Sequence, residues 1–340
     1  MTDPHVHFRD WNQSDKETVL HGMETGAKIG FNVFFDMPNT NPPVTNRENA
    51  IQRIHLGEYA ERELKHKGFD VHYHLYLGIT PDPSQIEEMV RTYQLFFPRV
   101  CGLKMFASQS TGDMGIVGKR SQQGIYSRLA ELGYEGVLAV HCEKEELFVR
   151  TASKHADVRP AASEVQSVKD QIDCAEKAGF KGTLHIAHIS TAGALKAVCD
   201  ARTRGIVKIT CGATPHHILL NRDKETEIVK MNPPLRDESD RLAVWNGLFD
   251  GSVDWIESDH APHTLEDKQK GASGIPGMEG MLLAVKALRE AGMEEDRLNA
   301  LLGANALEAF GIHQIPTKVP KVTKKLLDIA RKAYPISAWS

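Results

Sequence analysis

The sequence of 340 residues has few cysteines, no excess of basic residues and no long apolar segment. Its five cysteines include no Cys-x-x-Cys pair, which excludes a disulfide framework and a structural zinc knuckle. A formal net charge of −4 argues against the basic surface of a nucleic-acid-binding protein. Because we find neither a membrane-spanning segment nor a secretory leader, we expect a cytoplasmic protein without nucleic-acid or membrane partners.

Histidine, by contrast, is frequent, and many of the sixteen histidines lie in apolar, strand-like segments. The first such segment carries His5, His7 and Arg9 at alternate positions. Since successive side chains of a strand point to opposite faces, these three share one face. Two imidazoles at this spacing can chelate a divalent cation, and a guanidinium beside them can bind a carboxylate. The segment therefore indicates a combined metal and anion site.

Apolar strand-like segments alternate with amphipathic helical segments along most of the chain, which predicts a (β/α)8 TIM barrel over residues 1–311. A C-terminal extension with a short helix is expected at 312–340. Capping boxes at Ser14-x-x-Glu17 and Thr45-x-x-Glu48 predict the starts of the first two helices. After the first strand, further strands are predicted at 31–36, 71–79, 102–106, 136–142, 183–189, 206–212 and 253–258.

Three polar side chains stand at the ends of predicted strands. Catalytic residues of such barrels lie at the carboxyl ends of the strands, where the loops begin. His141, His188 and Asp259 occupy such positions. We therefore expect the histidines to be metal ligands and Asp259 to be a ligand or a general base.

Other histidines are interpreted as structural. His72 and His74 lie too early in their strand to reach its carboxyl end. His185 precedes the second rim histidine by three positions, so on a regular strand only one of the two faces the barrel axis. His216 and His217 follow the seventh strand on a loop, and we leave them structural.

Lys104 lies on the predicted strand 102–106, where a free ammonium would repel cations. An unpaired charge in a buried barrel is also costly. The lysine therefore either pairs with a carboxylate or reacts with carbon dioxide to become a bidentate carbamate. Its position in the sequence does not distinguish between the two.

Several motifs occur in one order along the chain. They are His5-x-His7-x-Arg9, Met37-Pro38-Asn39-Thr40, Gly102-Leu103-Lys104, His141, His188, Asn232-Pro233-Pro234-Leu235-Arg236 and Asp259-His260-Ala261-Pro262-His263. With these motifs the sequence resembles the dihydroorotase family of the amidohydrolase superfamily from residue 3 to about residue 311. It departs from the family at Trp11-Asn12, where members often have Pro-Gly. No segment for the small accessory β-sandwich of many members is visible, so a bare barrel is expected.

The resemblance implies two Zn²⁺ ions per chain, bridged by N6-carboxylysine at Lys104. The ligands implied for one ion are His5, His7 and Asp259, and those for the other are His141 and His188. The resemblance also implies a substrate-binding set. Its members are His7, Arg9, Asn39, Asn232, His263, Ser273 and Gly274, of which Arg9, Asn39 and His263 would hold the substrate carboxylate.

The implied reaction interconverts N-carbamoyl-L-aspartate and L-dihydroorotate during pyrimidine synthesis. A hydroxide shared by the metals would attack the ring carbonyl, with Asp259 as general base and then general acid. The loop at 107–118, with Ser110, Thr111 and Gly112, is either a lid over the substrate or an ordinary connection.

Two alternative functions remain open. One is a hydantoinase, dihydropyrimidinase or allantoinase, whose neutral rings do not need Arg9. The other is a non-catalytic barrel that binds another pyrimidine enzyme. The sequence does not decide the oligomeric state, and a homodimer is one option.

Overall fold

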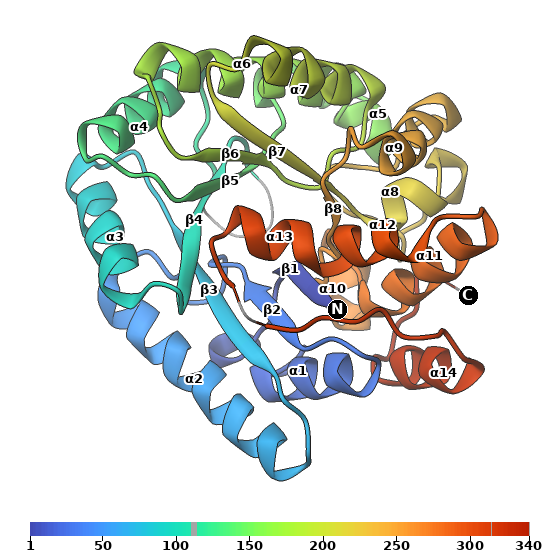
Figure 1. Cartoon of the computed structure of the whole chain (residues 1–340). Helices are drawn as coiled ribbons and strands as arrows, with labels where there is room; N and C mark the ends of the chain where they lie inside the picture. Colours follow the sequence, from blue (N-terminus) through green and yellow to red (C-terminus); the bar gives the residue numbers. More distant parts are fainter. Residues whose placement is uncertain (110–113, 314, 340) are drawn as a thin grey trace.

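The computed structural model describes residues 1–109, 114–313 and 315–339 and contains a barrel of eight parallel strands in sequential order (Figure 1). The predicted (β/α)8 TIM barrel is therefore confirmed. Strands β6 and β8 are shorter than the sequence suggests. The strands are β1 (Thr2–Val6), β2 (Val33–Asp36), β3 (His72–Gly78), β4 (Val100–Phe106), β5 (Val137–His141), β6 (Thr183–Ile186), β7 (Lys208–Ala213) and β8 (Trp255–Ile256).

Helices cover the outside of this sheet. None of those in the described ranges is both long and apolar enough to cross a membrane. The helices are α1 (Val19–Lys28), α2 (Arg47–His66), α3 (Pro83–Phe96), α4 (Lys119–Glu131), α5 (His155–Val158), α6 (Ala161–Ala178), α7 (Ala192–Arg204), α8 (Pro215–Leu219), α9 (Glu238–Asp250), α10 (Leu265–Gln269), α11 (Met278–Glu290), α12 (Glu295–Asn299), α13 (Asn305–Ala309) and α14 (Lys324–Lys332).

The barrel closes between its first and last strands through residues that follow β8. An isolated parallel bridge joins Val6 to His260, and the amide of His7 donates to the carbonyl of His260 at 2.7 Å. Ser258 adds a hydrogen bond from its amide to the carboxylate of Asp3 at 3.0 Å. Residues 258–260 are thus held against β1, which carries His5, and against His7, which follows it.

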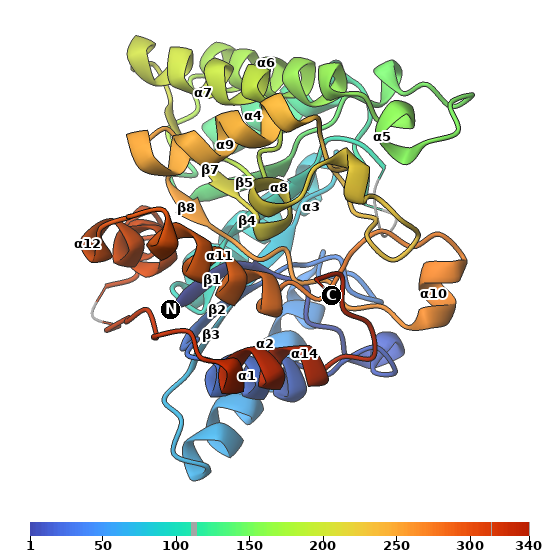
Figure 2. The same ribbon diagram turned by 90° about the vertical axis from the view of Figure 1, so that its right-hand side faces the viewer.

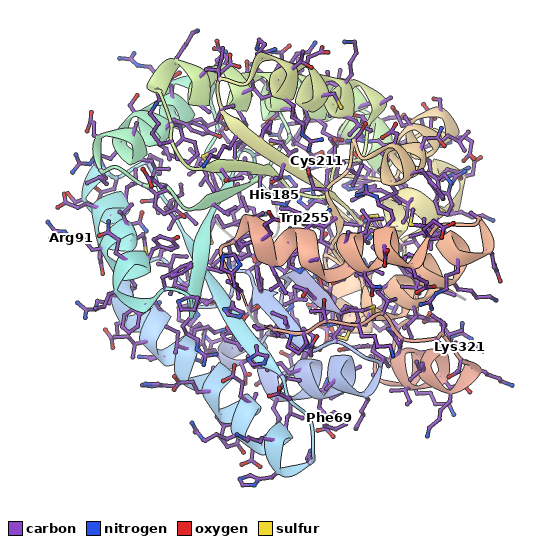
Figure 3. All side chains as sticks on the ribbon, viewed as in Figure 1. Phe69, Arg91, His185, Cys211, Trp255 and Lys321 are labelled. Atoms are coloured by element: carbon purple, nitrogen blue, oxygen red, sulfur yellow. The ribbon has the colours of Figure 1, made fainter. Side chains whose placement is uncertain are left out.

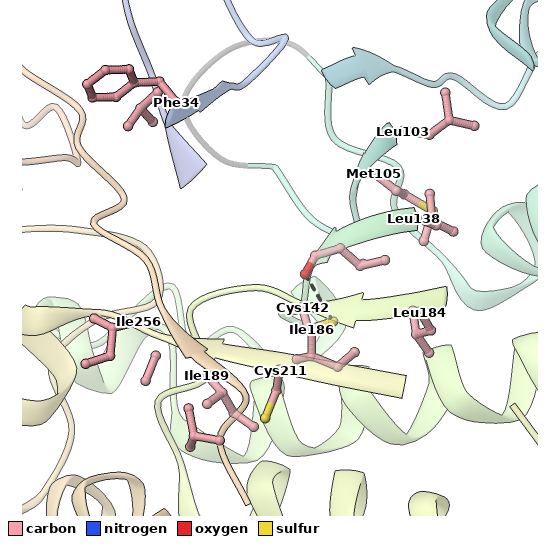
Figure 4. Close-up of a cluster of buried hydrophobic side chains, with 14 of the residues drawn as sticks. Phe34, Leu103, Met105, Leu138, Cys142, Leu184, Ile186, Ile189, Cys211 and Ile256 are labelled. Carbon is pink, nitrogen blue, oxygen red and sulfur yellow. Dashed lines mark hydrogen bonds between the residues drawn. The ribbon is translucent and has the colours of Figure 1, made fainter. Parts of the chain in front are cut away.

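Alternation along the strands separates an outer core from the barrel interior. Leu103 and Met105 belong to the main core of buried strand and helix residues, part of which Figure 4 shows with Leu138 and Ile186. Burying one such side chain is worth about 1.5–3 kcal/mol. Lys104, between them in sequence, points to the opposite side, into the barrel.

The amino-terminal end of the barrel is closed by apolar packing. Phe35 and Trp255 from the strands meet Phe310, which follows α13, and the Phe35 and Phe310 ring centroids lie 4.7 Å apart. Figure 1 shows α13 across this end, and Figure 3 shows Trp255 beside His185 near the centre. Figure 2 shows α5 and α10 on the opposite side of the molecule from α12.

The predicted cap of the first helix is wrong by four residues, and that of the second is wrong by one. Helix α1 begins at Val19 after the N-cap Thr18, and helix α2 is capped by Asn46. The capping box at Ser14 fails because Glu17 is buried and accepts hydrogen bonds elsewhere. Its Oε1 accepts from His260 Nε2 at 3.1 Å and from the Tyr334 hydroxyl at 2.5 Å.

The C-terminal stretch packs on the barrel, with α14 against α1 and α11 (Figure 2). Arg331 donates to Glu279 at 2.8 Å, and Trp339 donates from its indole nitrogen to the carbonyl of Pro276 at 3.2 Å. The same ring covers Gly280, where an added Cβ would lie 2.2 Å from a ring carbon. These contacts join the tail to the segment that follows β8.

Two helical glycines provide a test of this packing. A Cβ on Gly57 of α2 would lie 2.2 Å from the Tyr73 ring, whereas one on Gly124 of α4 meets no described atom within 4 Å. We expect Gly57→Ala to lower the free energy of unfolding by about 1–3 kcal/mol through overpacking. Gly124→Ala should raise it by up to about 1 kcal/mol through helix propensity. Urea denaturation monitored by circular dichroism measures both, and equal effects would contradict the packing argument.

Candidate metal and anion site

A pocket of about 410 Å³ opens at the carboxyl ends of the strands. Every predicted site residue except His263 lines it, together with Phe106 and Ala261. The lining residues are His5, His7, Arg9, Asn39, Lys104, Phe106, His141, His188, Asn232, Asp259, Ala261, Ser273 and Gly274.

The first group of predicted ligands, His5, His7 and Asp259, is buried and compact. His7 Nε2 lies 3.2 Å from His5 Nε2 and 3.0 Å from Asp259 Oδ1. His5 Nε2 lies 3.4 Å from the same carboxylate oxygen. On the far side of its ring, His7 Nδ1 faces Asn39 Oδ1 at 2.6 Å.

The second group lies beside the first. His141 Nδ1 is 3.1 Å from His188 Nε2, and the His188 ring centroid is 5.4 Å from that of His5. Lys104 lines the same pocket. The structure therefore brings together all six side chains for which the sequence predicts a metal-binding role.

Carboxylates behind two of the rings fix which nitrogen carries the hydrogen. His5 Nδ1 donates to Glu257 at 3.3 Å, and His141 Nε2 donates to Glu143 at 3.0 Å. In a neutral imidazole only one nitrogen is protonated, so the lone pairs of His5 Nε2 and His141 Nδ1 face the pocket. Lone pairs that converge beside a carboxylate fit a bound cation.

The electrostatics favour this neutral state of the imidazoles. Burial lowers the pKa of His5 to about 4 and also lowers the pKa values of His141 and His188. Burial disfavours the ionised form of Asp259, but the hydrogen bond with His7 and the nearby imidazoles hold its pKa below the usual range. At neutral pH the site thus combines neutral nitrogen donors with an anionic oxygen donor.

Lys104 is buried, and its Nζ has no hydrogen-bond partner among the described residues. It lies 5.0 Å from the centroid of the Phe106 ring. Burial lowers the pKa of Lys104 to about 8, against the opposing charges of Glu257 and Asp259. Of the two remedies considered from sequence, pairing with a protein carboxylate is not seen in the described part of the chain.

The predicted anion side is built around Arg9, which is buried at the pocket wall. Its Nε donates to the carbonyl of Pro262 at 3.2 Å, and no carboxylate forms an ion pair with it in the ranges that the structure describes. His263 lies behind it, with Nε2 3.4 Å from the guanidinium and 3.0 Å from the carbonyl oxygen of Ser273. Burial, then the charge of Arg9, lowers the pKa of His263 to about 3, so His263 is neutral.

Arg53 of α2 stabilises the backbone at Arg9. It forms an ion pair with Asp36 at 2.7 Å and donates to the carbonyls of Phe8 and Arg9. Its guanidinium lies 5.3 Å from the ring centroid of Trp11, the residue at which the sequence departs from the family's Pro-Gly. Trp11 adopts a positive φ of 51°, so the chain turns here without glycine.

Lys268 fixes the loops that carry the remaining predicted substrate-binding residues. This buried ammonium donates to the carbonyl oxygens of Lys230, Ala272 and Gly274 at 3.0, 2.9 and 2.9 Å. All three of its hydrogens are therefore used. The bonds tie the segment before Asn232 to the segment that contains Ser273 and Gly274.

The expectation that only one of His185 and His188 faces the barrel axis is wrong. Strand β6 ends at Ile186, and His188 has a positive φ of 41°, which breaks the alternation. Both residues contact Glu257, through His185 Nε2 at 3.1 Å and the amide of His188 at 2.6 Å. Asp259, with a φ of 48°, likewise lies beyond the end of its strand.

Sequence reasoning missed Glu257 and Glu143. Each is two positions from a rim residue, Asp259 and His141 respectively. Strand alternation could not have found them, because β8 ends at Ile256 and β5 ends at His141, so both glutamates lie beyond their strands.

The other histidines lie outside the pocket lining. His74 is buried, and its Nδ1 faces the carbonyl of Pro98 at 2.7 Å. His217 is held between the Thr214 hydroxyl at 2.8 Å and the carbonyl of Pro233 at 3.1 Å. Ser110, Thr111 and Gly112 of the proposed lid fall outside the described residues.

No protein-family model matches the chain. The chain is 36% identical over 287 residues to the dihydroorotase of Pyrococcus abyssi, which covers 82% of this chain but only 59% of that protein. It is 32% identical over 331 residues to the dihydroorotase of Lactobacillus gasseri, covering 92% of this chain and 73% of that protein.

Among solved structures, an L-hydantoinase (dihydropyrimidinase) from Arthrobacter aurescens has a TM-score of 0.78 at 21% identity, covering 92% of this chain and 71% of that one. At this identity the likeness shows a shared barrel fold only. The identity over most of the Lactobacillus gasseri protein goes further: the chain belongs to the dihydroorotase family of amidohydrolases.

Proposed function

We propose that the protein is a dihydroorotase, which interconverts L-dihydroorotate and N-carbamoyl-L-aspartate. The observation that carries this proposal is the pocket itself. Neutral imidazoles and the Asp259 carboxylate converge on one side, and on the other lies the guanidinium of Arg9, which forms no ion pair within the described residues. A cyclic amide with an acidic substituent matches both sides.

The metal-binding part of the proposal assigns His5, His7 and Asp259 to one Zn²⁺ and His141 and His188 to a second. Lys104, as a carbamate, would bridge them. A buried amine with a lowered pKa and no partner in the described residues supports this role, because the neutral amine is the form that reacts with carbon dioxide. When bound, two such ions lower the pKa of water and polarise the carbonyl that is attacked.

The protein's own groups then orient the substrate and move the proton. Arg9 would bind the substrate carboxylate with two parallel hydrogen bonds, assisted by Asn39 and by neutral His263. Asp259, kept ionised, would take the proton from the attacking water and return it to the ring nitrogen that leaves. Its Oδ1 lies near both His7 and His5, at the edge of the pocket.

Arg9 also favours this substrate over neutral rings. A buried guanidinium without an ion partner is costly, and a substrate carboxylate would remove that cost. A neutral hydantoin ring would leave Arg9 unpaired, which disfavours binding.

Purified protein should hydrolyse L-dihydroorotate and form it from N-carbamoyl-L-aspartate, and removal of zinc by a chelator should abolish both activities. Restoring zinc should restore them. The loss of absorbance of the ring amide measures the first reaction. Faster turnover of hydantoin, dihydrouracil or allantoin would overturn the substrate assignment, and activity that survives complete zinc removal would overturn the metal assignment.

Lys104→Ala should bind no bridged metal pair and should show only the background rate. Because the substitution removes an unpaired buried ammonium, the metal-free variant should remain folded. Zinc analysis, activity and urea denaturation are measured together, with Lys196→Ala on the exposed face of α7 as the control. Two zinc ions per chain in the Lys104 variant would refute the bridging role.

Arg9→Lys should raise KM for L-dihydroorotate about 10–100-fold, since a lysine cannot reproduce a bidentate contact worth about 1.5–3 kcal/mol. Zinc content should not change. The residual rate with dihydrouracil, which lacks the carboxylate, should be unaffected and provides the control. An equal loss for both rings would show that Arg9 acts on the site as a whole rather than on the carboxylate.

A further inference from the structure

Glu257 lies directly after β8, two residues before Asp259, and is fully buried. Four N–H groups surround its carboxylate. Oε1 faces His5 Nδ1 at 3.3 Å and accepts from the amide of His188 at 2.6 Å. Oε2 faces His185 Nε2 at 3.1 Å and accepts from the indole nitrogen of Trp255 at 3.0 Å.

These four contacts use the whole accepting capacity of an ionised carboxylate. Two of the donors, the backbone amide and the indole, can only donate. Because the ionised Glu257 carboxylate can only accept, Nε2 of His185 carries the hydrogen, and the Thr210 hydroxyl, 3.1 Å from the other ring nitrogen, donates to that nitrogen. The arrangement leaves one tautomer for His5, with its hydrogen on Nδ1 and its lone pair on Nε2.

The two donors at Oε1 belong to different halves of the proposed metal centre. His5 is a predicted ligand of one ion and His188 of the other. Contact with Glu257 directs Nε2 of His5 into the pocket and holds the backbone of His188 at its positive φ of 41°. Glu143, by comparison, contacts only one predicted ligand, His141, and is otherwise paired with arginine.

We propose that Glu257 is a positioning residue that sets the orientation of one ligand in each half of the metal centre. The inference rests on the proposed function, because it assigns metal-binding roles to His5 and His188. It predicts that loss of the carboxylate weakens both metal sites while the barrel stays folded. A carboxylate that serves only the core would affect stability but not metal affinity.

The experiment compares Glu257→Met, which removes every acceptor, with Glu257→Gln, in which one oxygen is replaced by a donating group. Asp254→Asn is the matched control. That carboxylate lies three residues earlier, where it accepts from Arg202 and from the amide of Cys211, and it does not line the pocket. Full-length chains are titrated with zinc against a chelator, and urea denaturation reports stability.

Loss of a hydrogen-bond acceptor behind a metal-binding histidine typically costs 10–100-fold in affinity. We expect Glu257→Met to lose at least tenfold in zinc affinity at both sites, Glu257→Gln to lose less, and Asp254→Asn to match the wild type. If the methionine variant does not fold, the glutamine variant decides. Wild-type affinity at both sites in the folded variants would overturn the proposal.

A second readout separates this proposal from the proposed function. Nitrogen-15 NMR of the histidine rings in the zinc-free full chain reports the tautomer of His5, whose signal is assigned by its absence in His5→Gln. We expect the Nδ1–H form in the wild type and a mixture in Glu257→Met, whether or not the protein binds zinc. An unchanged His5 tautomer would overturn the positioning role, whereas a wild-type chain that binds no zinc would overturn the metal centre.

Discussion

The site depends on hydrogen-bond acceptors that lie behind its imidazoles. A neutral imidazole turns a lone pair toward a cation only when its other nitrogen donates its hydrogen elsewhere. Glu257 and Glu143 accept these hydrogens from His5 and His141. Each carboxylate is fully buried and remains ionised because several N–H groups, or Arg159, surround it. A layer of buried anions thus supports a layer of neutral bases that faces the pocket.

The two cationic side chains of the pocket, unlike most of its imidazoles, have no carboxylate partner in the described part of the chain. Both side chains, those of Arg9 and Lys104, are buried. Burial without such a partner is costly, and the charges of nearby carboxylates such as Asp259 offset only part of the cost. A carbamate on Lys104 and a substrate carboxylate at Arg9 would supply direct anionic partners. On the proposed function, the chain would give up stability to gain affinity for acidic ligands.

Much of the architecture was predictable because it follows from local rules. Strand alternation placed His5, His7 and Arg9 on one face, and the rule of carboxyl ends selected His141. Those rules failed where tertiary contacts take over. Glu17 does not form its predicted capping box and instead accepts a hydrogen bond from Tyr334 in the C-terminal stretch. The positive φ of His188 places its side chain on the same side of the barrel wall as that of His185. Neither feature has a signature in the neighbouring sequence.

The predicted metal ligands and most of the predicted substrate-binding residues lie on different parts of the fold, which affects how substrate specificity can change. The predicted metal ligands lie at or just beyond strand ends, where the paired barrel limits their movement. The predicted ring-binding residues Asn232, Ser273 and Gly274 lie on loops that Lys268 joins through three carbonyl groups, with a further bond from the amide of Gly274 to the carbonyl of Lys230. Loops vary in sequence more readily than the strands they connect, so these residues can change with little effect on the predicted metal ligands. One barrel fold is thus compatible with different rings, because the loop residues predicted to contact the ring are separable from the residues predicted to bind metal.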